Sequence, residues 1–122
     1  MVEDKIHSRS TGPKVMLTRQ PAEGRSRDGG LRVGEMERDC MIGHGVGSFL
    51  KESMLDRSDR YEMHVGRKCG LTSVVNSSKN IVDTFAEDKN DSKDAAKVQV
   101  PYAFKLLSQE LQAMAIAPRL RV

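Results

Sequence analysis

GRSRDGGLRVGEMERDC, residues 24–40, contains the boundary between two kinds of sequence. Its first half is rich in glycine and arginine and has the period of neither a helix nor a strand, whereas its second half starts a regular apolar pattern. We therefore predict an irregular basic arm over residues 1–33 and a helical segment from Gly34 onward. Within the arm, only Lys14–Leu17 has the composition of a short strand.

Residues 34–58 make up the predicted helical segment. Apolar or small residues recur in it at steps of three and four, the spacing of one helix face: Met36, Cys40, Gly43, Gly47, Leu50 and Met54. The glycines from Gly43 to Gly47 are the expected break, so the segment is either a helical hairpin or one kinked helix. Cys40 lies on the apolar face, and we interpret it as a small buried core residue.

The second half of the chain is predicted to contain strands and one more helix, which gives the fold class α+β. Residues 59–100 form a small strand cluster, with strands at 61–65, 71–75 and 97–100, interrupted by an acidic polar loop over residues 83–97. Residues 101–122 form the last part of the fold. Pro101 starts an amphipathic helix that runs until Pro118 stops it, and residues 119–122 alternate as a terminal strand would.

The length and composition limit what the chain can be. With 122 residues and 13.6 kDa it is one domain at most, and with three Phe, two Tyr and no Trp it lacks the large side chains of a self-sufficient core. Two cysteines allow a single disulfide, which favours an intracellular setting over a secreted one. We expect a soluble chain, because the sequence shows neither a membrane-spanning apolar run nor a signal peptide.

The net charge is only +3, and the basic excess lies at the two ends of the chain, one of which is the arm. Four arginines lie in a glycine-rich stretch, residues 19–32, where guanidinium groups and bare backbone amides can both reach phosphate. A solvated basic loop explains the same composition and is favoured on composition alone. No aromatic residue is interleaved, so any contact is with the nucleic-acid backbone and not with bases. The candidate nucleic-acid-binding residues are Lys5, Arg19, Arg25, Arg27 and Arg32.

Neither a catalytic residue nor a metal site is predicted. The stretch GHGVG, residues 43–47, has the spacing of neither a dinucleotide fingerprint nor a P-loop. Cys40 and His44 are four residues apart on a helix, but no third group orients the histidine. Cys69 and His64 supply only two of the four ligands of a tetrahedral zinc site, and His7 has no visible partner.

Three segments together resemble the C-terminal region of the second-largest subunit of multisubunit DNA-directed RNA polymerase, of the eukaryotic, archaeal and large-DNA-virus type. They are MVEDKIHSRSTGP at residues 1–13, LTRQPAEGRSRDGGLRVGEMERDCMIGHG at residues 17–45 and VPYAFKLLSQELQAMAIAPRLRV at residues 100–122. The resemblance covers nearly all of the chain except about residues 66–97. It implies that the chain is a fragment, a split gene product or a truncated copy of a much longer transcription subunit.

The resemblance also implies roles for the matching residues. Arg25, Arg27 and Arg32 would contact template DNA near the RNA–DNA hybrid, in a loop that orders as the polymerase closes. Apolar helix faces would pack against the largest polymerase subunit: Met36, Cys40, Leu50, Leu107 and Leu111. The chain would belong to a nucleotidyltransferase whose Mg is bound elsewhere, with no catalytic residue and no cofactor of its own. The expected location is the nucleus, or a virion or viral factory if the chain is viral, and no membrane is involved.

One departure from the family concerns zinc. Most nuclear and archaeal relatives hold two Cys-x-x-Cys pairs here, whereas this chain keeps only Cys69, with Gly66 in the partner position. The zinc site is therefore expected to be lost, which a fast-evolving lineage, a viral enzyme or a degenerate copy would explain. Two alternatives to a polymerase fragment stay open: a stand-alone nucleic-acid-binding module, and an inactive duplicate that binds a polymerase but not nucleic acid.

Overall fold

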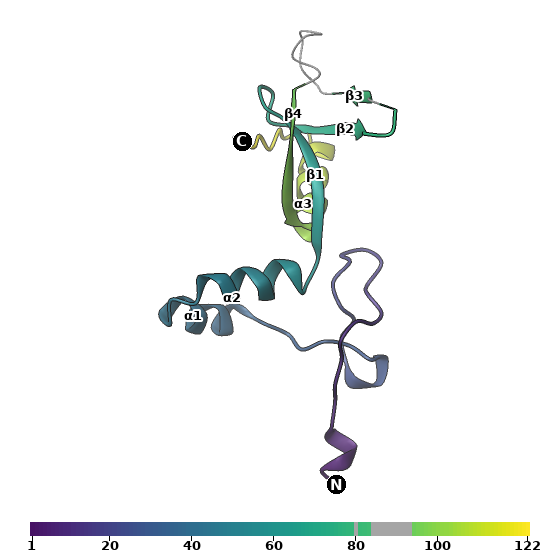
Figure 1. The fold of residues 1–122 in the computed structure, drawn as a ribbon, viewed down its shortest axis with the longest axis vertical. Coiled ribbons are helices and arrows are strands. Elements are labelled where there is room, and N and C mark those ends of the chain that lie inside the picture. The colour runs from purple at the N-terminus through teal and green to yellow at the C-terminus, as the bar shows by residue number, and fades with distance from the viewer. Residues whose placement is uncertain (80, 84–93) are drawn as a thin grey trace. The chain divides into compact units, whose positions relative to one another are not determined.

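The computed structural model of the chain describes residues 1–79, 81–83 and 94–122 (Figure 1). The chain divides into two compact units, Met1–Arg60 and Tyr61–Val122, which are described separately below. The predicted α+β class is confirmed, because three α-helices and a sheet are present. Most of the acidic loop predicted over residues 83–97 lies outside the described residues.

The arm of the first unit consists of turns and loops. Two short 3-10 turns, Glu3–Lys5 and Arg25–Arg27, flank a hairpin-like loop, residues 13–22. Within this loop Lys14 and Pro21 form an isolated antiparallel bridge. The strand predicted at Lys14–Leu17 is therefore wrong. Proline has no N–H to donate, so the pairing at Pro21 has no basis for extension into a ladder.

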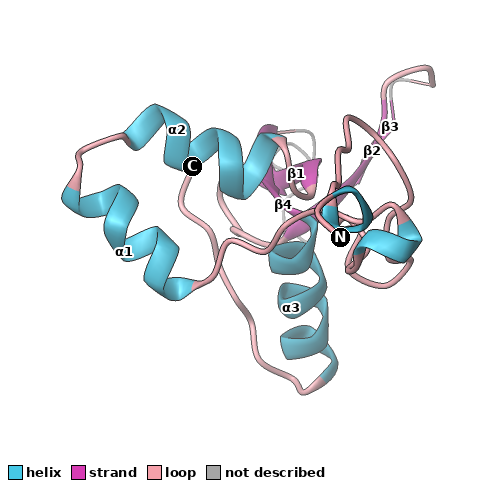
Figure 2. Cartoon of the chain, turned by 90° about the horizontal axis from the view of Figure 1, so that it is seen from below, coloured by secondary structure: helices cyan, strands magenta, loops and turns pink. Residues whose placement is uncertain are grey.

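The helical segment of the first unit is broken where the glycines predict. Helix α1 spans Glu35–Gly43 and helix α2 spans Gly47–Lys51, and α2 continues into a π-helical turn, Glu52–Asp56 (Figure 2). Gly45 lies in the connection with a φ of 68°, a left-handed conformation that favours glycine. At the start of α1, the Glu37 carboxylate accepts a hydrogen bond from the Gly34 N–H at 2.9 Å, which is half of a capping box.

The apolar face of these helices is not covered. No residue of α1, of α2 or of the π-helical turn is buried, and Met36 is 81% exposed. Cys40 is exposed as well, so its interpretation as a buried core residue is wrong. The apolar spacing marks a helix face, but contact between α1 and α2 alone leaves this face without buried residues.

The second unit contains a four-stranded sheet with the strand order β3-β2-β1-β4. Its strands are β1 (Arg60–Gly66), β2 (Thr72–Asn76), β3 (Ile81–Asp83) and β4 (Ala95–Pro101). Strands β1 and β2 are antiparallel, with Val65 opposite Thr72, and β2 and β3 are also antiparallel. The three predicted strands are confirmed, and β3 is an addition that the sequence did not indicate.

Helix α3 (Tyr102–Ala113) follows β4 directly and contacts it. The small core lies in this unit: Val65 is fully buried, and Met63 and Ala96 are buried beside it in the sheet. At the start of α3 the Tyr102 ring meets the Tyr61 ring of β1 edge to face, with their centroids 5.2 Å apart. The contact between Tyr61 and Tyr102 thus helps to hold α3 against the sheet.

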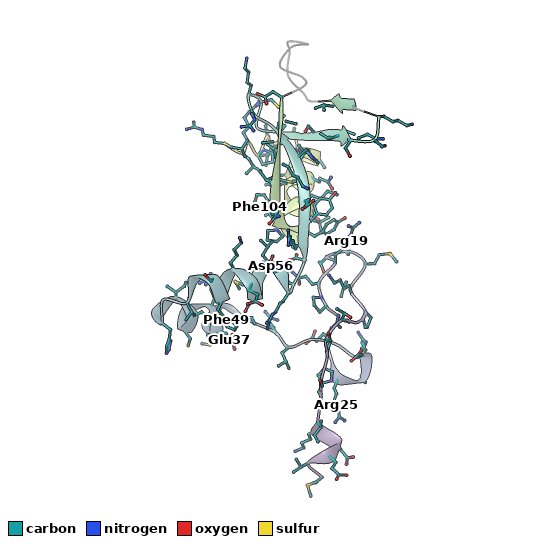
Figure 3. All side chains as sticks on the ribbon, viewed as in Figure 1. Arg19, Arg25, Glu37, Phe49, Asp56 and Phe104 are labelled. Carbon is teal, nitrogen blue, oxygen red and sulfur yellow. The ribbon has the colours of Figure 1, made fainter. Side chains whose placement is uncertain are left out.

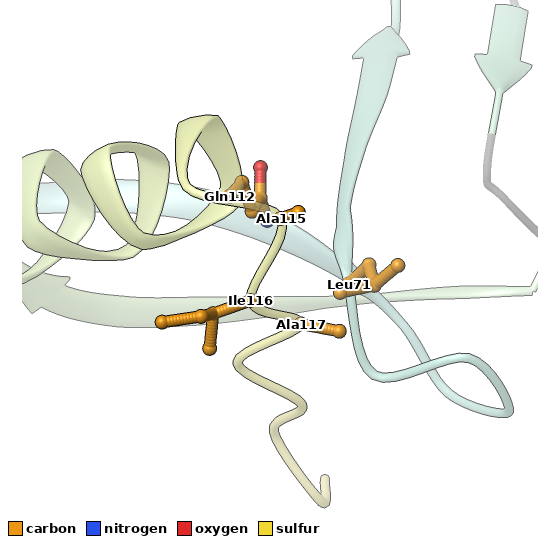
Figure 4. Close-up of a pocket in the computed structure, with 5 residues that line it drawn as sticks. All are labelled: Leu71, Gln112, Ala115, Ile116 and Ala117. Atoms are coloured by element: carbon orange, nitrogen blue, oxygen red, sulfur yellow. The ribbon is translucent and has the colours of Figure 1, made fainter.

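Helix α3 ends earlier than predicted. The sequence suggested a stop at Pro118, but the helix ends at Ala113, where Ile116 donates to the Leu111 carbonyl and Ala115 to the Gln112 carbonyl, both at 3.0 Å. Ala115 has a φ of 60°, so these bonds form a Schellman motif with alanine in the place usually taken by glycine. Figure 4 shows the hollow beside this end, lined by Leu71, Gln112, Ala115, Ile116 and Ala117.

The terminal strand predicted for residues 119–122 is also wrong. None of these residues has strand geometry. Instead, the Leu120 N–H donates to the Gly70 carbonyl at 2.8 Å and the Arg119 Nη1 donates to the Cys69 carbonyl at 2.7 Å. Both acceptors, the carbonyls of Cys69 and Gly70, lie in a tight turn and not in a strand. The C-terminal tail, residues 119–122, therefore does not extend the sheet.

Candidate nucleic-acid interface

The basic residues of the arm are presented by a closed loop, residues 24–29, which we call the arginine loop. Its two ends are joined because the Gly29 N–H donates to the Gly24 carbonyl at 2.9 Å. Gly24 has a φ of 96° and Asp28 a φ of 52°, and between them Arg25–Arg27 form a single 3-10 turn. The local sequence folds this way because glycine and aspartate both tolerate the left-handed region.

Gly29 fixes the shape of the arginine loop. It is buried, and a Cβ atom at this position would lie 2.2 Å from the Ala22 carbonyl oxygen. The Gly30 N–H then donates to the same carbonyl at 2.9 Å. Only glycine allows the backbone to approach so closely, which is why the pair of glycines follows the arginines.

Arg25, Arg27 and Arg32 are exposed, and Arg25 is labelled in Figure 3. Within the part of the chain that the structure describes, the three side chains make no hydrogen bond and no ion pair. Arg25 and Arg27 project from one turn, and Arg32 follows the loop on the path to α1. Arg25 and Arg27 are thus presented by one closed turn, and all three arginines lack a partner among the described residues.

The other two candidates, Arg19 and Lys5, lie outside the turn that carries Arg25 and Arg27. Arg19 lies in the neighbouring hairpin-like loop with a φ of 54°, where its N–H donates to the Val15 carbonyl at 2.8 Å. The Ala22 N–H closes that loop by donating to the Pro13 carbonyl at 3.1 Å, and the Ala22 carbonyl accepts the Gly30 N–H at 2.9 Å just after the arginine loop. Lys5 ends the first 3-10 turn of the chain, and its side chain is exposed.

Two residues that were not among the candidates, His7 and Arg9, contact the arginine loop, so the expectation that His7 has no partner is wrong. The Nε2 of His7 is hydrogen-bonded to the Gly29 carbonyl, and the Nη1 of Arg9 donates to the Asp28 carbonyl at 2.6 Å. Their partners are 22 and 19 residues away along the chain. A contact between a side chain and a distant backbone carbonyl leaves no mark on spacing or periodicity, so no sequence pattern could have indicated it.

The turn that contains Cys69, residues 66–70, does not offer a zinc site. It is closed by the Gly70 N–H, which donates to the Gly66 carbonyl at 2.8 Å, and Cys69 is half-buried in it. Among residues 1–79, 81–83 and 94–122 there is no group of three or more His, Cys, Asp or Glu side chains that could hold a metal. A tetrahedral zinc needs four such ligands, so the described residues do not fit one. We call residues 66–70 the Cys69 turn.

The hollow at the end of α3 is lined by residues without a titratable side chain. None of the described helices combines the length and the hydropathy needed to cross a bilayer.

Comparison with known proteins places the whole chain in one family. The family model described as RNA polymerase Rpb2, domain 7, matches residues 29–122, and that of domain 6 matches residues 1–27. DNA-directed RNA polymerase II subunit 2 of Arabidopsis thaliana is 58% identical over 120 residues, which are 98% of this chain and 10% of that protein.

More distant relatives agree with this assignment. DNA-directed RNA polymerase II subunit RPB2 of Encephalitozoon cuniculi is 54% identical over 121 residues, 99% of this chain and 10% of that protein. DNA-directed RNA polymerase subunit Rpo2 of Saccharolobus shibatae is 51% identical over 120 residues, 98% of this chain and 10% of that protein. The chain spans about a tenth of the length of these curated relatives. The resemblance carried by the sequence motifs is confirmed: the chain belongs to the family of the second-largest subunit of DNA-directed RNA polymerase and corresponds to the C-terminal region of that subunit.

Proposed function

We propose that this sequence acts in the nucleus as the C-terminal region of the second-largest subunit of an RNA polymerase, where its arm holds the template strand and the RNA–DNA hybrid. The observation that carries the proposal is the arginine loop. Arg25, Arg27 and Arg32 are exposed and have no partner among the described residues. Arg25 and Arg27 lie in the loop that the Gly29–Gly24 hydrogen bond closes, and Arg32 follows that loop. Relatives named as polymerase II subunits in eukaryotes support the nuclear location.

The proposed contacts are with phosphates. A guanidinium group matches the geometry of a phosphate, and glycine lets a strand approach the backbone closely. The arm contains no aromatic residue over residues 1–33 on which a base could stack. The loop therefore positions the nucleic acid without reading its sequence.

The proposed protein partner is the largest polymerase subunit, together with the other subunits of the complex. Support comes from the apolar face of α1 and α2, where Met36 is 81% exposed and Phe49 46% exposed. In α3, Leu107 is 51% exposed, while Leu50 of α2 and Leu111 of α3 are half-buried. Apolar side chains exposed along helix faces are stabilised when a partner covers them.

We propose no catalytic residue, cofactor or zinc in this chain. Nucleotidyl transfer and its Mg would belong to other parts of the complete polymerase. The reason for proposing no zinc is that Cys69 and His64 supply only two of the four ligands that a tetrahedral site needs.

A salt series on a polymerase reconstituted with this sequence tests the proposal. Each arginine that neutralises a phosphate releases counterion, so the triple change of Arg25, Arg27 and Arg32 to Ala should flatten the log–log salt dependence of template binding by about three units at most. The matched control removes the same charge elsewhere, by changing the exposed Lys51, Lys79 and Arg121 to Ala, and should leave the slope unchanged. An unchanged slope in the loop variant, or a loss confined to particular base sequences, would refute the proposed contacts.

A further inference from the structure

Two side chains from residues 7–12, those of His7 and Arg9, contact the last two residues of the arginine loop, Asp28 and Gly29. His7 is hydrogen-bonded to the Gly29 carbonyl through Nε2. Arg9 makes two bonds from a single nitrogen: its Nη1 donates to the Pro13 carbonyl at 3.0 Å and to the Asp28 carbonyl at 2.6 Å. Arg9 thus ties the hairpin-like loop to the arginine loop, because Pro13 belongs to the first and Asp28 to the second.

The position of Arg9 is built into the neighbouring backbone. A Cβ atom at Gly12 would lie 3.2 Å from both Cζ and Nη1 of Arg9, and 3.1 Å from the Asp28 carboxylate oxygen Oδ2. The guanidinium group and the Asp28 side chain therefore occupy the space that a side chain at residue 12 would need. Gly12 allows the arm to come close enough for Arg9 to reach both carbonyls.

We infer that Arg9 is a positioning residue, which orders the arginine loop before nucleic acid binds. Asp28 is the left-handed residue at the end of the 3-10 turn that carries Arg25 and Arg27. By holding the Asp28 carbonyl, Arg9 fixes the position of the C-terminal end of that turn. Binding then requires less ordering of the loop, so affinity rises without a new phosphate contact. This inference rests on the proposed function of the arginine loop.

The first test separates positioning from direct contact. In a reconstituted polymerase, Arg9→Lys keeps the positive charge, but the lysine ammonium ends about one bond short of the Arg9 Nη1 position. We expect template affinity to fall about fivefold, the effect of one hydrogen bond of ordinary strength, while the salt slope stays unchanged. Arg121→Lys, at an exposed residue outside the arm, is the matched control and should change neither quantity. Unchanged affinity in Arg9→Lys would overturn the inference.

Arg9→Gln shows whether Arg9 itself contacts phosphate, because it removes the charge. If Arg9 only positions the loop, the salt slope of Arg9→Gln stays that of the parent protein, whereas a direct phosphate contact lowers it by about one unit. A lower slope would overturn the positioning role.

A second test reads the loop directly, with no nucleic acid present. In Arg9→Lys we expect an arginine-specific protease to cut after Arg25 and Arg27 several-fold faster, while cutting after Arg57 in the helical segment keeps its rate. Gly12→Ala should have a smaller effect in the same direction, because the new Cβ displaces Arg9, and Gly43→Ala is its control, since the space around Gly43 is open. Equal acceleration at all three sites would show a general loss of stability and overturn the inference.

The two proposals can fail separately. If Arg9→Lys accelerates cleavage in the loop but the triple arginine change leaves the salt slope intact, Arg9 positions a loop that does not bind the template, and the proposed function is wrong. If the triple change flattens the slope but Arg9→Lys alters neither affinity nor cleavage, the loop binds nucleic acid without help from Arg9.

Discussion

The arginine loop and the Cys69 turn are closed by the same kind of bond but differ in what surrounds their polar groups. In each, a glycine N–H donates to the carbonyl of a preceding glycine, at 2.9 Å for Gly29 and 2.8 Å for Gly70. The arginines of the first loop have no partner among the described residues. In the Cys69 turn, by contrast, Arg67 forms a 3.0 Å ion pair with Asp94, and the tail donates to two of the turn's carbonyls.

This difference distinguishes a loop that exposes its cations for binding from a loop that only stabilises the fold. A glycine-to-glycine hydrogen bond closes the backbone in both cases, so closure alone does not indicate binding. What distinguishes the arginine loop is that its cations are not neutralised within the described chain, and are therefore available to an external anion. The Cys69 turn uses Arg67 and two of its carbonyls internally.

The largest expected effect comes from preventing the arginine loop from closing. Gly29→Ala would bring a Cβ to 2.2 Å from the Ala22 carbonyl oxygen, so the backbone must move. We expect template affinity to fall about a hundredfold, which corresponds to about 2.7 kcal/mol. The affinity of the reconstituted polymerase measures this, with Gly43→Ala as control. If Gly29→Ala binds as tightly as the parent protein, closure of the loop does not matter for binding.

The equivalent change in the Cys69 turn should affect stability and not binding. Gly70 has a φ of 72°, and a Cβ there would lie 2.8 Å from the Leu120 carbonyl oxygen. We expect Gly70→Ala to lower the free energy of unfolding of the second unit by about 2 kcal/mol. Urea denaturation can be followed by tyrosine fluorescence, because both tyrosines, Tyr61 and Tyr102, lie in this unit. A loss of template affinity comparable to that of Gly29→Ala would remove the distinction between the two loops.

A smaller effect is expected from the ion pair that neutralises the Cys69 turn. The side chains of Arg67 and Asp94 are 54% and 53% exposed, so solvent screens their attraction. Asp94→Asn should therefore lower the free energy of unfolding by about 0.5 kcal/mol at most. The same urea titration, repeated at high salt, provides the measurement, and the difference between variant and parent should shrink as salt rises. A loss of several kcal/mol would mean that the pair is essential to the turn.

No effect at all is expected from metal removal. If hydrogen bonds and the ion pair hold the Cys69 turn, a chelator should change neither the urea midpoint nor the tyrosine signal, because four-ligand zinc sites couple folding to metal and this turn lacks the ligands. Elemental analysis of the purified chain should find no stoichiometric zinc. One zinc per chain, lost together with structure on chelation, would contradict this expectation.

The sequence predicts those features that depend on local residue types and spacing. The break between α1 and α2, three of the strands and the start of α3 follow from glycines, alternation and Pro101. The end of α3 could not be predicted, because Ala115 adopts a left-handed φ of 60° that alanine rarely takes. Strand β3 is too short, at three residues, to show a period.

The predictions at the candidate site were limited in the same way. The arginines of the loop were indicated by composition and by resemblance, whereas His7 and Arg9 act through backbone carbonyls far along the chain. Cys40 shows a different limit of prediction from sequence. Its spacing places it correctly on an apolar helix face, but spacing cannot tell whether the cover for that face comes from the same chain.

The contact between the tail and the Cys69 turn also has a mechanical consequence. The Arg119 side chain reaches the carbonyl of a residue 50 positions earlier, and the Leu120 N–H holds the next carbonyl. Both acceptors lie in the turn that joins β1 to β2, and neither bond belongs to the pairing of these strands. The tail can therefore be pulled away without breaking a hydrogen bond between the strands, which makes it a separable clasp on the turn.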